Sequence, residues 1–217
     1  MNPHSPTLAF IGGGNMARSL IGGLIADQYD ANSIWVADPH TDGLGGLRLE
    51  FGVHTTSNNV EAAQHADVVV LAVKPQALRG VARELAECIQ TRQPLVISIA
   101  AGVRETDISR WLGGDVALVR TMPNTPALVK SGATALYANT RVNATQREQA
   151  ETVLRSVGVT LWVDQEEQLD SVTALSGSGP AYFFLFLEHL EAAARELGLS
   201  ATAAHRPPVD TAYGPRR

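Results

Sequence analysis

Short apolar runs alternate with helical patterns through the first part of the chain. Between the first two runs, apolar residues recur at helical spacing from Met16 to Ile25, and Gln76–Gln90 gives a second amphipathic helix. This alternation is typical of βαβ units, so we expect an α/β fold with a doubly wound, mostly parallel sheet. The predicted strands are Leu8–Ile11, Ile34–Ala37, Val68–Val73, Leu95–Ile99, Val116–Arg120, Ala133–Tyr137 and Thr160–Val163.

The pattern changes near residue 165, after which we expect only helices. Gln165–Leu175 and Pro180–Leu197 both have helical patterns, and the second has a proline in its first turn and a glycine after its end. Its first half, Tyr182–Leu187, is apolar nearly all round, which predicts that it is buried or packed on a partner. We therefore divide the chain into an α/β domain over residues 1–164 and an incomplete helical domain over residues 165–217.

A glycine-rich turn follows the first predicted strand and opens the first helix. It fits the pattern G-x-G-x-x-A, in which Gly12 makes the tight turn, Gly14 lets the backbone approach a pyrophosphate, and Ala17 allows close helix packing. Phosphates would meet free N–H groups and the positive end of the helix dipole. A bare tight turn is the disfavoured alternative. The pattern predicts a Rossmann-type domain that binds NAD or NADP through Gly12, Gly13, Gly14, Asn15, Met16 and Ala17.

Asp38 ends the second predicted strand. An acidic side chain there can accept hydrogen bonds from ribose hydroxyls and would repel a 2′-phosphate, which favours NAD over NADP. An Asp before Pro39 is equally a common turn initiator. Both interpretations stay open.

Composition narrows the class of ligand. The 217 residues are 45% hydrophobic and carry a formal net charge of −5, so no basic surplus is present for nucleic acid or an anionic membrane, and a small-molecule partner is expected. The single Cys88 is expected to be a buried, inert thiol. The histidines lack metal-binding spacing, so we predict no metal. Neither a signal peptide nor a membrane-spanning run is evident, which predicts a soluble, cytoplasmic protein.

Several segments match one enzyme family in order and spacing. They are Phe10–Ala17, Asp67–Gln76, Ser98–Val103, Arg120–Pro126 and Leu175–Tyr182. On these motifs the chain resembles the pyrroline-5-carboxylate reductases. The resemblance implies hydride transfer from NADPH or NADH to the C=N carbon of 1-pyrroline-5-carboxylate, which gives L-proline, with the cofactor carrying the difficult chemistry.

The resemblance extends the cofactor site along the ends of the strands. It implies that Lys74 and Pro75 lie beside the nicotinamide half, as the rule for open α/β sheets also predicts, although Lys74 can also be read as a solvated strand-end lysine. It puts Asn59 near the adenosine ribose, with an N-cap as the equally weighted alternative. Together with Asp38, which is predicted from its place at the end of the second strand, the cofactor set comprises Asn59, Ala72, Val73, Lys74, Pro75, Ala100, Ala101, Gly102, Met122 and Pro123.

The resemblance also implies a substrate site. Thr173 corresponds to the family's threonine near the ring nitrogen and is the expected catalytic residue. At a predicted joint between two helices, the glycines of Ser176–Pro180 would expose backbone N–H groups. A nucleophilic serine is disfavoured because the pattern G-x-S-x-G would need glycine at position 176. Without the resemblance, Met122–Pro126 is equally a structural loop. The implied substrate-binding residues are Asn124, Ser176, Gly177, Ser178 and Gly179.

The chain departs from the family near its C-terminal end. Family members continue through a Ser-Pro-Gly-Gly-Thr-type segment at the substrate carboxylate and through helices that join two subunits, whereas Pro207-Pro208 and Pro215-Arg216-Arg217 look foreign. We therefore expect a C-terminally truncated member of the family. Both its activity and its ability to form the family's homo-oligomer should be impaired. The alternative is an inactive dinucleotide-binding remnant. A 3-hydroxyacid dehydrogenase is disfavoured, because such enzymes use a lysine in the helical domain and none follows Lys130.

Overall fold

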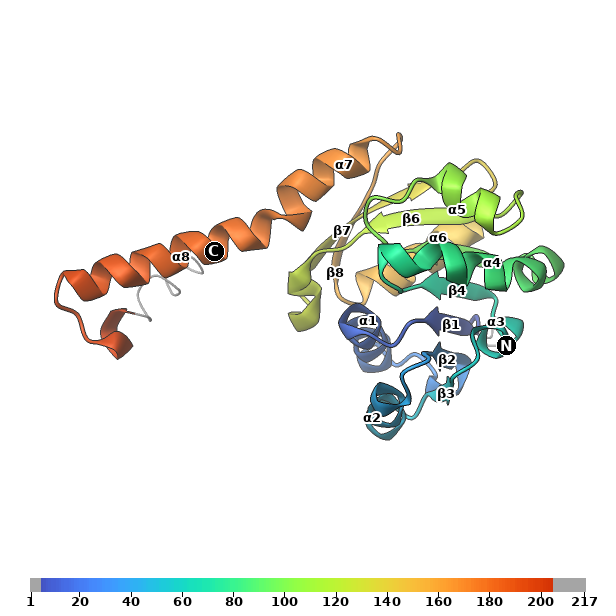
Figure 1. The fold of residues 1–217 in the computed structure, drawn as a ribbon, viewed down its shortest axis with the longest axis horizontal. Helices are drawn as coiled ribbons and strands as arrows, with labels where there is room; N and C mark the ends of the chain where they lie inside the picture. Colours follow the sequence, from blue (N-terminus) through green and yellow to red (C-terminus); the bar gives the residue numbers. More distant parts are fainter. Residues whose placement is uncertain (1–4, 205–217) are drawn as a thin grey trace.

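One eight-stranded sheet, in the order β3-β2-β1-β4-β5-β6-β7-β8, forms the body of the computed structural model, which describes residues 5–204 (Figure 1). Neighbours from β3 through β6 are parallel, β7 is antiparallel to β6, and β8 is parallel to β7. The strands are β1 Leu8–Ile11, β2 Ile34–Ala37, β3 His54–Thr56, β4 Val68–Leu71, β5 Leu95–Ser98, β6 Leu118–Met122, β7 Gly132–Ala138 and β8 Gly158–Trp162.

Helices connect these strands and then continue alone. The α-helices are α1 Asn15–Ala26, α2 Thr41–Phe51, α3 Asn59–Gln64, α4 Pro75–Arg92, α5 Glu105–Trp111, α6 Ala144–Arg155, α7 Gln168–Val172 and α8 Gly179–Glu196. Shorter helical segments are η1 Ala31–Ser33, η2 Thr125–Val129 and the π-helical turn η3 Thr173–Gly177. The α/β class with a Rossmann-type sheet followed by a helical unit is thus confirmed.

The order of the strands creates a switch point between β1 and β4. β2 and β3 lie on one side of β1, whereas β4, β5 and β6 lie on the other. In-register pairing from Leu8 with Val68 to Ile11 with Leu71 brings the exits of β1 and β4 side by side. In open α/β sheets, ligands bind outside the carboxyl ends of the strands at such a point.

The observed strands follow the predicted pattern with informative exceptions. β1 and β2 have the predicted bounds, whereas β6 begins at Leu118 and continues to Met122. The sequence pattern does not predict β3, because this short edge strand is His54-Thr55-Thr56 and contains no apolar run. An apolar pattern detects strands that are buried on both faces and passes over polar edges.

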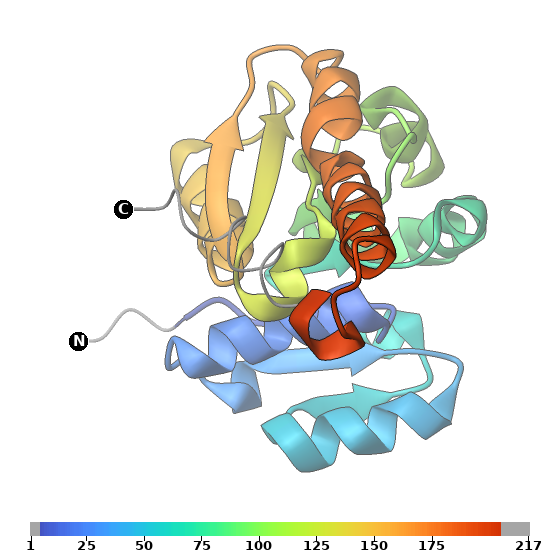
Figure 2. The same cartoon turned by 90° about the vertical axis from the view of Figure 1, so that its left-hand side faces the viewer.

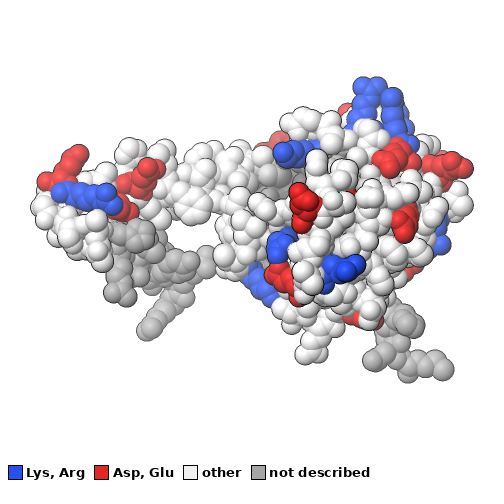
Figure 3. Space-filling view, turned by 60° about the horizontal axis from the view of Figure 1, so that its bottom comes forward, with Lys and Arg blue, Asp and Glu red and all other residues white. Residues whose placement is uncertain are grey.

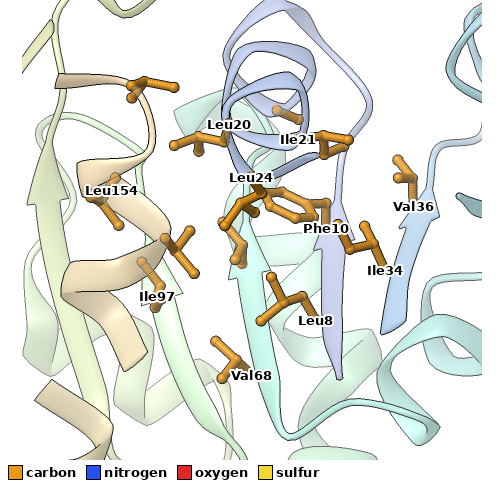
Figure 4. Packing of buried hydrophobic residues seen from close by; sticks show 14 of the residues in the cluster. Leu8, Phe10, Leu20, Ile21, Leu24, Ile34, Val36, Val68, Ile97 and Leu154 are labelled. Atoms are coloured by element: carbon orange, nitrogen blue, oxygen red, sulfur yellow. The ribbon is translucent and has the colours of Figure 1, made fainter. Parts of the chain in front are cut away.

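Helices cover both faces of the sheet. On one face, Leu8 and Phe10 of β1 pack against α1, and the same cluster takes in residues of α2 and α6 (Figure 4). On the other face, α3, α4 and α5 pack against alternate residues of the same strands, including Ile11 and Leu71. This two-sided burial explains why the central strands lack polar alternation.

Cys88 lies in the second of these clusters, on α4. The thiol is buried, and burial raises its pKa while Arg92 lowers it. The expectation of a buried thiol is therefore met. Within residues 5–204, no helix is both long and apolar enough to cross a membrane.

The helix α8 extends away from the sheet as a long arm (Figure 1), and in Figure 2 the same helix points toward the viewer. Between Asp170 and Glu188 the sequence has no charged residue, and the middle of the arm is correspondingly free of charge in Figure 3. Phe183 is 69% exposed and its aromatic neighbours are similarly open. The expected burial within the chain is therefore wrong, and packing on a partner stays a prediction.

The edge strand β8 is attached to α6 through Glu151. This carboxylate accepts hydrogen bonds from the Thr160 hydroxyl (3.0 Å) and the Trp162 indole N–H (3.2 Å), and it pairs with Arg155 one helical turn away. The hydrogen bond from Trp162 is the largest cause that lowers the pKa of Glu151; Thr160 and Arg155 lower it further, and desolvation opposes them. The ionised form of Glu151 therefore stabilises the fold.

We predict that Glu151→Gln removes a pH-dependent part of the stability. Because the folded-state pKa is depressed, this contribution is present above the unfolded-state pKa of about 4.3 and is lost as pH falls through the folded value. Urea unfolding should show a deficit of the variant relative to the unmodified protein at pH 7 that shrinks toward pH 3. Glu148→Gln, at an exposed position of the same helix, is the control. A deficit independent of pH would contradict the assignment.

Candidate active site

The glycine-rich turn between β1 and α1 is shaped by one close approach. Gly12 has φ of +105°, and a Cβ on it would lie 2.7 Å from the carbonyl oxygen of Ala72. Its N–H donates to the carbonyl of Ala37 at 2.7 Å. Only glycine fits this position without strain, because a side chain would collide with the backbone after β4. The turn is therefore packed against the carboxyl ends of the two strands that flank β1, which are β2 and β4.

Gly14 is open, in contrast to Gly12. It is the N-cap of α1 with φ of −72°, and no atom lies within 4 Å of a Cβ built on it. The first turn of α1 has neither a capping side chain nor an acidic residue. The helix N-terminus, which includes Asn15 and Met16, is thus available to an anionic group, while Ala17 is buried against the core.

Asp38 acts on the turn from the end of β2. Its Oδ2 accepts the Gly13 N–H at 2.8 Å and its Oδ1 accepts the His40 N–H at 2.9 Å. The turn-initiating interpretation is therefore realised. It does not displace the ribose interpretation, since each carboxylate oxygen has a further lone pair with which to accept a hydroxyl group.

The ends of β4, β5 and β6 contribute the other predicted cofactor residues along the same edge. Ala72 and Val73 are half-buried, and Pro75 is the first residue of α4. Lys74 has an exposed side chain whose ammonium group meets no hydrogen-bond or ion-pair partner in the part of the chain that the structure describes. Ala100, Ala101 and Gly102 follow β5, and Met122 and Pro123 end and follow β6.

The structure corrects the alternative interpretation of Asn59. The N-cap of α3 is Asn58, whose side chain accepts the N–H groups of Val60 and Glu61. Asn59 is instead the first helical residue, and its Nδ2 donates to Glu84 Oε2 at 3.0 Å. Two adjacent asparagines cannot be told apart by capping preference alone.

Asn124 joins three segments. Its Oδ1 accepts the Ala133 N–H of β7 at 2.9 Å, and its Nδ2 lies 3.2 Å from the carbonyl oxygen and 3.1 Å from the hydroxyl of Ser176. Beside it, a Cβ on Gly177 would lie 2.6 Å from Met122 Cε. The helical unit therefore touches the carboxyl end of β6, and three of the predicted substrate-binding residues, Asn124, Ser176 and Gly177, lie close together.

The segment Thr173–Gly177 is a π-helical turn, which corrects the expected joint between two helices. The Ser178 N–H donates to the carbonyl of Thr173 at 2.8 Å. This N–H is therefore occupied within the helix and is not available to a ligand, contrary to the expectation for this segment. Gly179 begins α8. Glycines at these positions predict a break, but the chain stays helical and passes through one wider, π-type turn instead. The Thr173 hydroxyl donates to the Leu169 carbonyl at 2.7 Å.

An ion pair between a buried arginine and a partly buried glutamate, near the start of the helical unit, is not predicted from the sequence. Arg120 of β6 pairs with Glu166, and their side chains are 6% and 13% exposed. Both lie near Tyr137, whose pKa is raised by burial and then by Glu166, Glu105 and Glu167, while Arg120 lowers it. The available signal is a single arginine in a strand whose other residues are uncharged.

The comparisons with known proteins agree with this architecture. Residues 7–102 match the family model "NADP oxidoreductase coenzyme F420-dependent", and residues 166–215 match "Pyrroline-5-carboxylate reductase dimerisation". Pyrroline-5-carboxylate reductases from Pseudomonas aeruginosa and Escherichia coli are 49% and 37% identical to this chain over 97% and 92% of it. The chain spans 77% and 74% of the length of these relatives.

Solved structures show the same likeness. A pyrroline-5-carboxylate reductase from Coxiella burnetii has a TM-score of 0.93 and 46% identity, with 97% of this chain and 78% of that chain covered. A Plasmodium falciparum pyrroline carboxylate reductase with NADP bound has a TM-score of 0.86 and 29% identity, with 97% and 77% covered. A prephenate dehydrogenase from A. aeolicus, at 16% identity and a TM-score of 0.67 over 88% of this chain and 71% of that chain, shares the fold.

Substitutions at Gly12 and Gly14 should separate folding from binding. Gly14→Ala meets no neighbour, and the cost of alanine at the N-cap is partly offset by the lower entropy of the unfolded chain, so we expect its free energy of unfolding to change by less than about 1 kcal/mol. Its methyl group would occupy the space of the approaching pyrophosphate, so NADPH and NADH, followed by nucleotide fluorescence, should bind roughly tenfold more weakly. Gly12→Ala should instead cost about 2–4 kcal/mol of stability. Wild-type affinity in Gly14→Ala would exclude this turn as the phosphate site.

Proposed function

The chain belongs to the pyrroline-5-carboxylate reductase family, and from this premise we infer that it reduces 1-pyrroline-5-carboxylate to L-proline with NAD(P)H as cofactor. The observation that carries this inference is the contact of the π-helical turn with the end of β6, through Asn124 and Ser176. A turn that bears Thr173 thereby lies beside the strand end that faces a nicotinamide in a Rossmann-type sheet.

We propose that the dinucleotide lies along the carboxyl ends of the strands. The open position at Gly14 and the uncapped N-terminus of α1 fit a pyrophosphate. Asp38 and Asn59 would serve the adenosine half, and Lys74 the nicotinamide half. The remaining proposed cofactor residues are Gly12, Gly13, Asn15, Met16, Ala17, Ala72, Val73, Pro75, Ala100, Ala101, Gly102, Met122 and Pro123.

We propose that Thr173 binds the imine nitrogen of the substrate. Its hydroxyl hydrogen is already donated to the Leu169 carbonyl, so its oxygen is left to accept the N–H of a protonated imine. Ser176 Oγ accepts a hydrogen bond from Asn124, which leaves the Ser176 hydroxyl hydrogen free for the substrate carboxylate. Gly177, Ser178 and Gly179 would shape the same turn.

In this arrangement the reduced nicotinamide, when bound, supplies the hydride. The chain would orient the imine carbon toward it. A protonated imine is already electrophilic, so no strong general acid is required among the residues.

We propose that the α/β domain ends at residue 164 and that the helical unit after it binds a second copy of the chain. The exposed apolar surface of α8 and the match of residues 166–215 to a dimerisation model support this. The tail from Pro207 to Arg217, on which the expected truncation rests, lies outside the described residues. A cytoplasmic location and the absence of nucleic-acid binding stay predictions from charge and composition.

Oxidation of NADPH and NADH, followed at the reduced nicotinamide absorbance with and without pyrroline-5-carboxylate, tests the function. We expect substrate-dependent oxidation, with kcat/KM lowered roughly 10- to 100-fold in Thr173→Val, the effect of one hydrogen bond to a charged group. Thr173→Ser, which keeps the hydroxyl, is the control and should lose much less. Cofactor binding without turnover would favour the inactive dinucleotide-binding alternative.

Asp38→Asn should change the choice between the two cofactors. Removing the carboxylate removes its repulsion of a 2′-phosphate, so kcat/KM for NADPH should rise roughly tenfold relative to that for NADH. Asp27→Asn, an identical charge change at the exposed far end of α1, should leave the ratio unchanged. An unaltered ratio in Asp38→Asn would restrict this residue to its contacts with Gly13 and His40.

A further inference from the structure

The guanidinium of Arg120 is buried in a strand that is otherwise apolar or small. Its only hydrogen-bond and ion-pair partner among the described residues is Glu166. It shares a face of β6 with Met122, because alternate residues of a strand point to the same side. A buried charge is costly unless it is paired and hydrogen-bonded. The pair therefore needs a reason other than stability, since apolar residues of similar volume would often serve as well.

Glu166 is engaged from several directions. Its Oε1 accepts hydrogen bonds from Arg120 and from the Glu105 backbone N–H (2.5 Å), and its Oε2 lies 3.9 Å from Arg104 Nη1. Arg104 also pairs with Glu167 and Asp170 at 3.2 Å each, at the surface. The chain just before α7 is thus attached to β6 and to the start of α5.

The helix that begins after Glu166 carries the proposed substrate residues. Leu169 is buried, its carbonyl accepts the hydroxyl of Thr173, and Ser176 lies one turn further, beside Asn124. Gly177 contacts Met122, two residues after Arg120 on the same face of β6. The π-helical turn is therefore positioned by two successive contacts along β6. The first is the ion pair of Arg120 with Glu166, and the second is the contact of Met122 with Gly177.

We propose that Arg120 and Glu166 are positioning residues, whose ion pair holds the π-helical turn at a fixed place over the end of β6. The catalytic consequence rests on the proposed function. Misplacement of Thr173 by about 1 Å is expected to cost about 100-fold in rate. The cofactor turn at Gly12–Ala17 lies on β1 and α1 and should be unaffected, and of the proposed cofactor residues only Met122 and Pro123 lie within three positions of Arg120.

The test replaces both partners at once, because a single truncation would leave a buried, unpaired charge and could unfold the chain. The variant is Arg120→Met with Glu166→Met, and the matched control is Glu167→Gln, whose side chain is 70% exposed on the same segment. Hydrogen exchange of residues 168–178, the NADPH dissociation constant, and kcat and KM for pyrroline-5-carboxylate are measured for each.

We expect exchange over residues 168–178 to accelerate at least about tenfold in the double variant, as expected when a local opening loses about 1.4 kcal/mol of restraint. We also expect kcat/KM to fall about 100-fold, with part of the loss in kcat, and the NADPH dissociation constant to stay within about twofold. Glu167→Gln should resemble the unmodified protein in all of these measurements.

Unchanged exchange would overturn the proposal whatever the activity, and faster exchange with unchanged kcat/KM would overturn its catalytic part. If the unmodified protein binds NADPH but shows no turnover, the proposed function fails, and exchange alone then decides whether the pair holds the turn. Should the double variant not fold, Arg120→Lys decides, since it keeps the charge but loses the planar fork. Arg120→Lys should accelerate exchange over residues 168–178 and lower kcat/KM, both to a smaller extent than expected for the double variant.

Discussion

The approach of Gly12 to the carbonyl of Ala72 is the contact on which the rest of the site depends. It requires a residue without a side chain, and it brings the segments that follow the carboxyl ends of β1 and β4 into direct contact. The open N-terminus of α1 then faces the edge from which β4, β5 and β6 emerge.

The sequence predicts those parts of the fold and of the candidate site that depend on neighbouring residues in the chain. The buried strands are recognisable because both of their faces meet helices, and the turn at Gly12–Ala17 because glycine is needed for close approach. The polar strand β3 has no such signature. The capping role of Asn58 in place of Asn59 depends on a backbone geometry that composition does not encode.

The parts that the sequence did not reveal depend on contacts between distant residues. Arg120 and Glu166 are 46 positions apart, and neither has a local pattern that announces the other. The glycines of residues 177 and 179 suggest a break in the helix, yet the chain stays helical through a π turn, because Asn124 and Met122 support it from the sheet. Tertiary contacts here override the local preference of glycine.

The arm α8 gives this turn a mechanical property. Its 18 residues at 1.5 Å each make a rod of about 27 Å that grows directly from the π-helical turn. A rotation of about 5° at the base would move the tip by about 2 Å, so the tip magnifies whatever angular freedom the base retains. Conversely, a partner that holds the far end of α8 would restrict rotation of the helix at its base. Rigidity where the substrate residues sit can therefore be imposed from far outside the site.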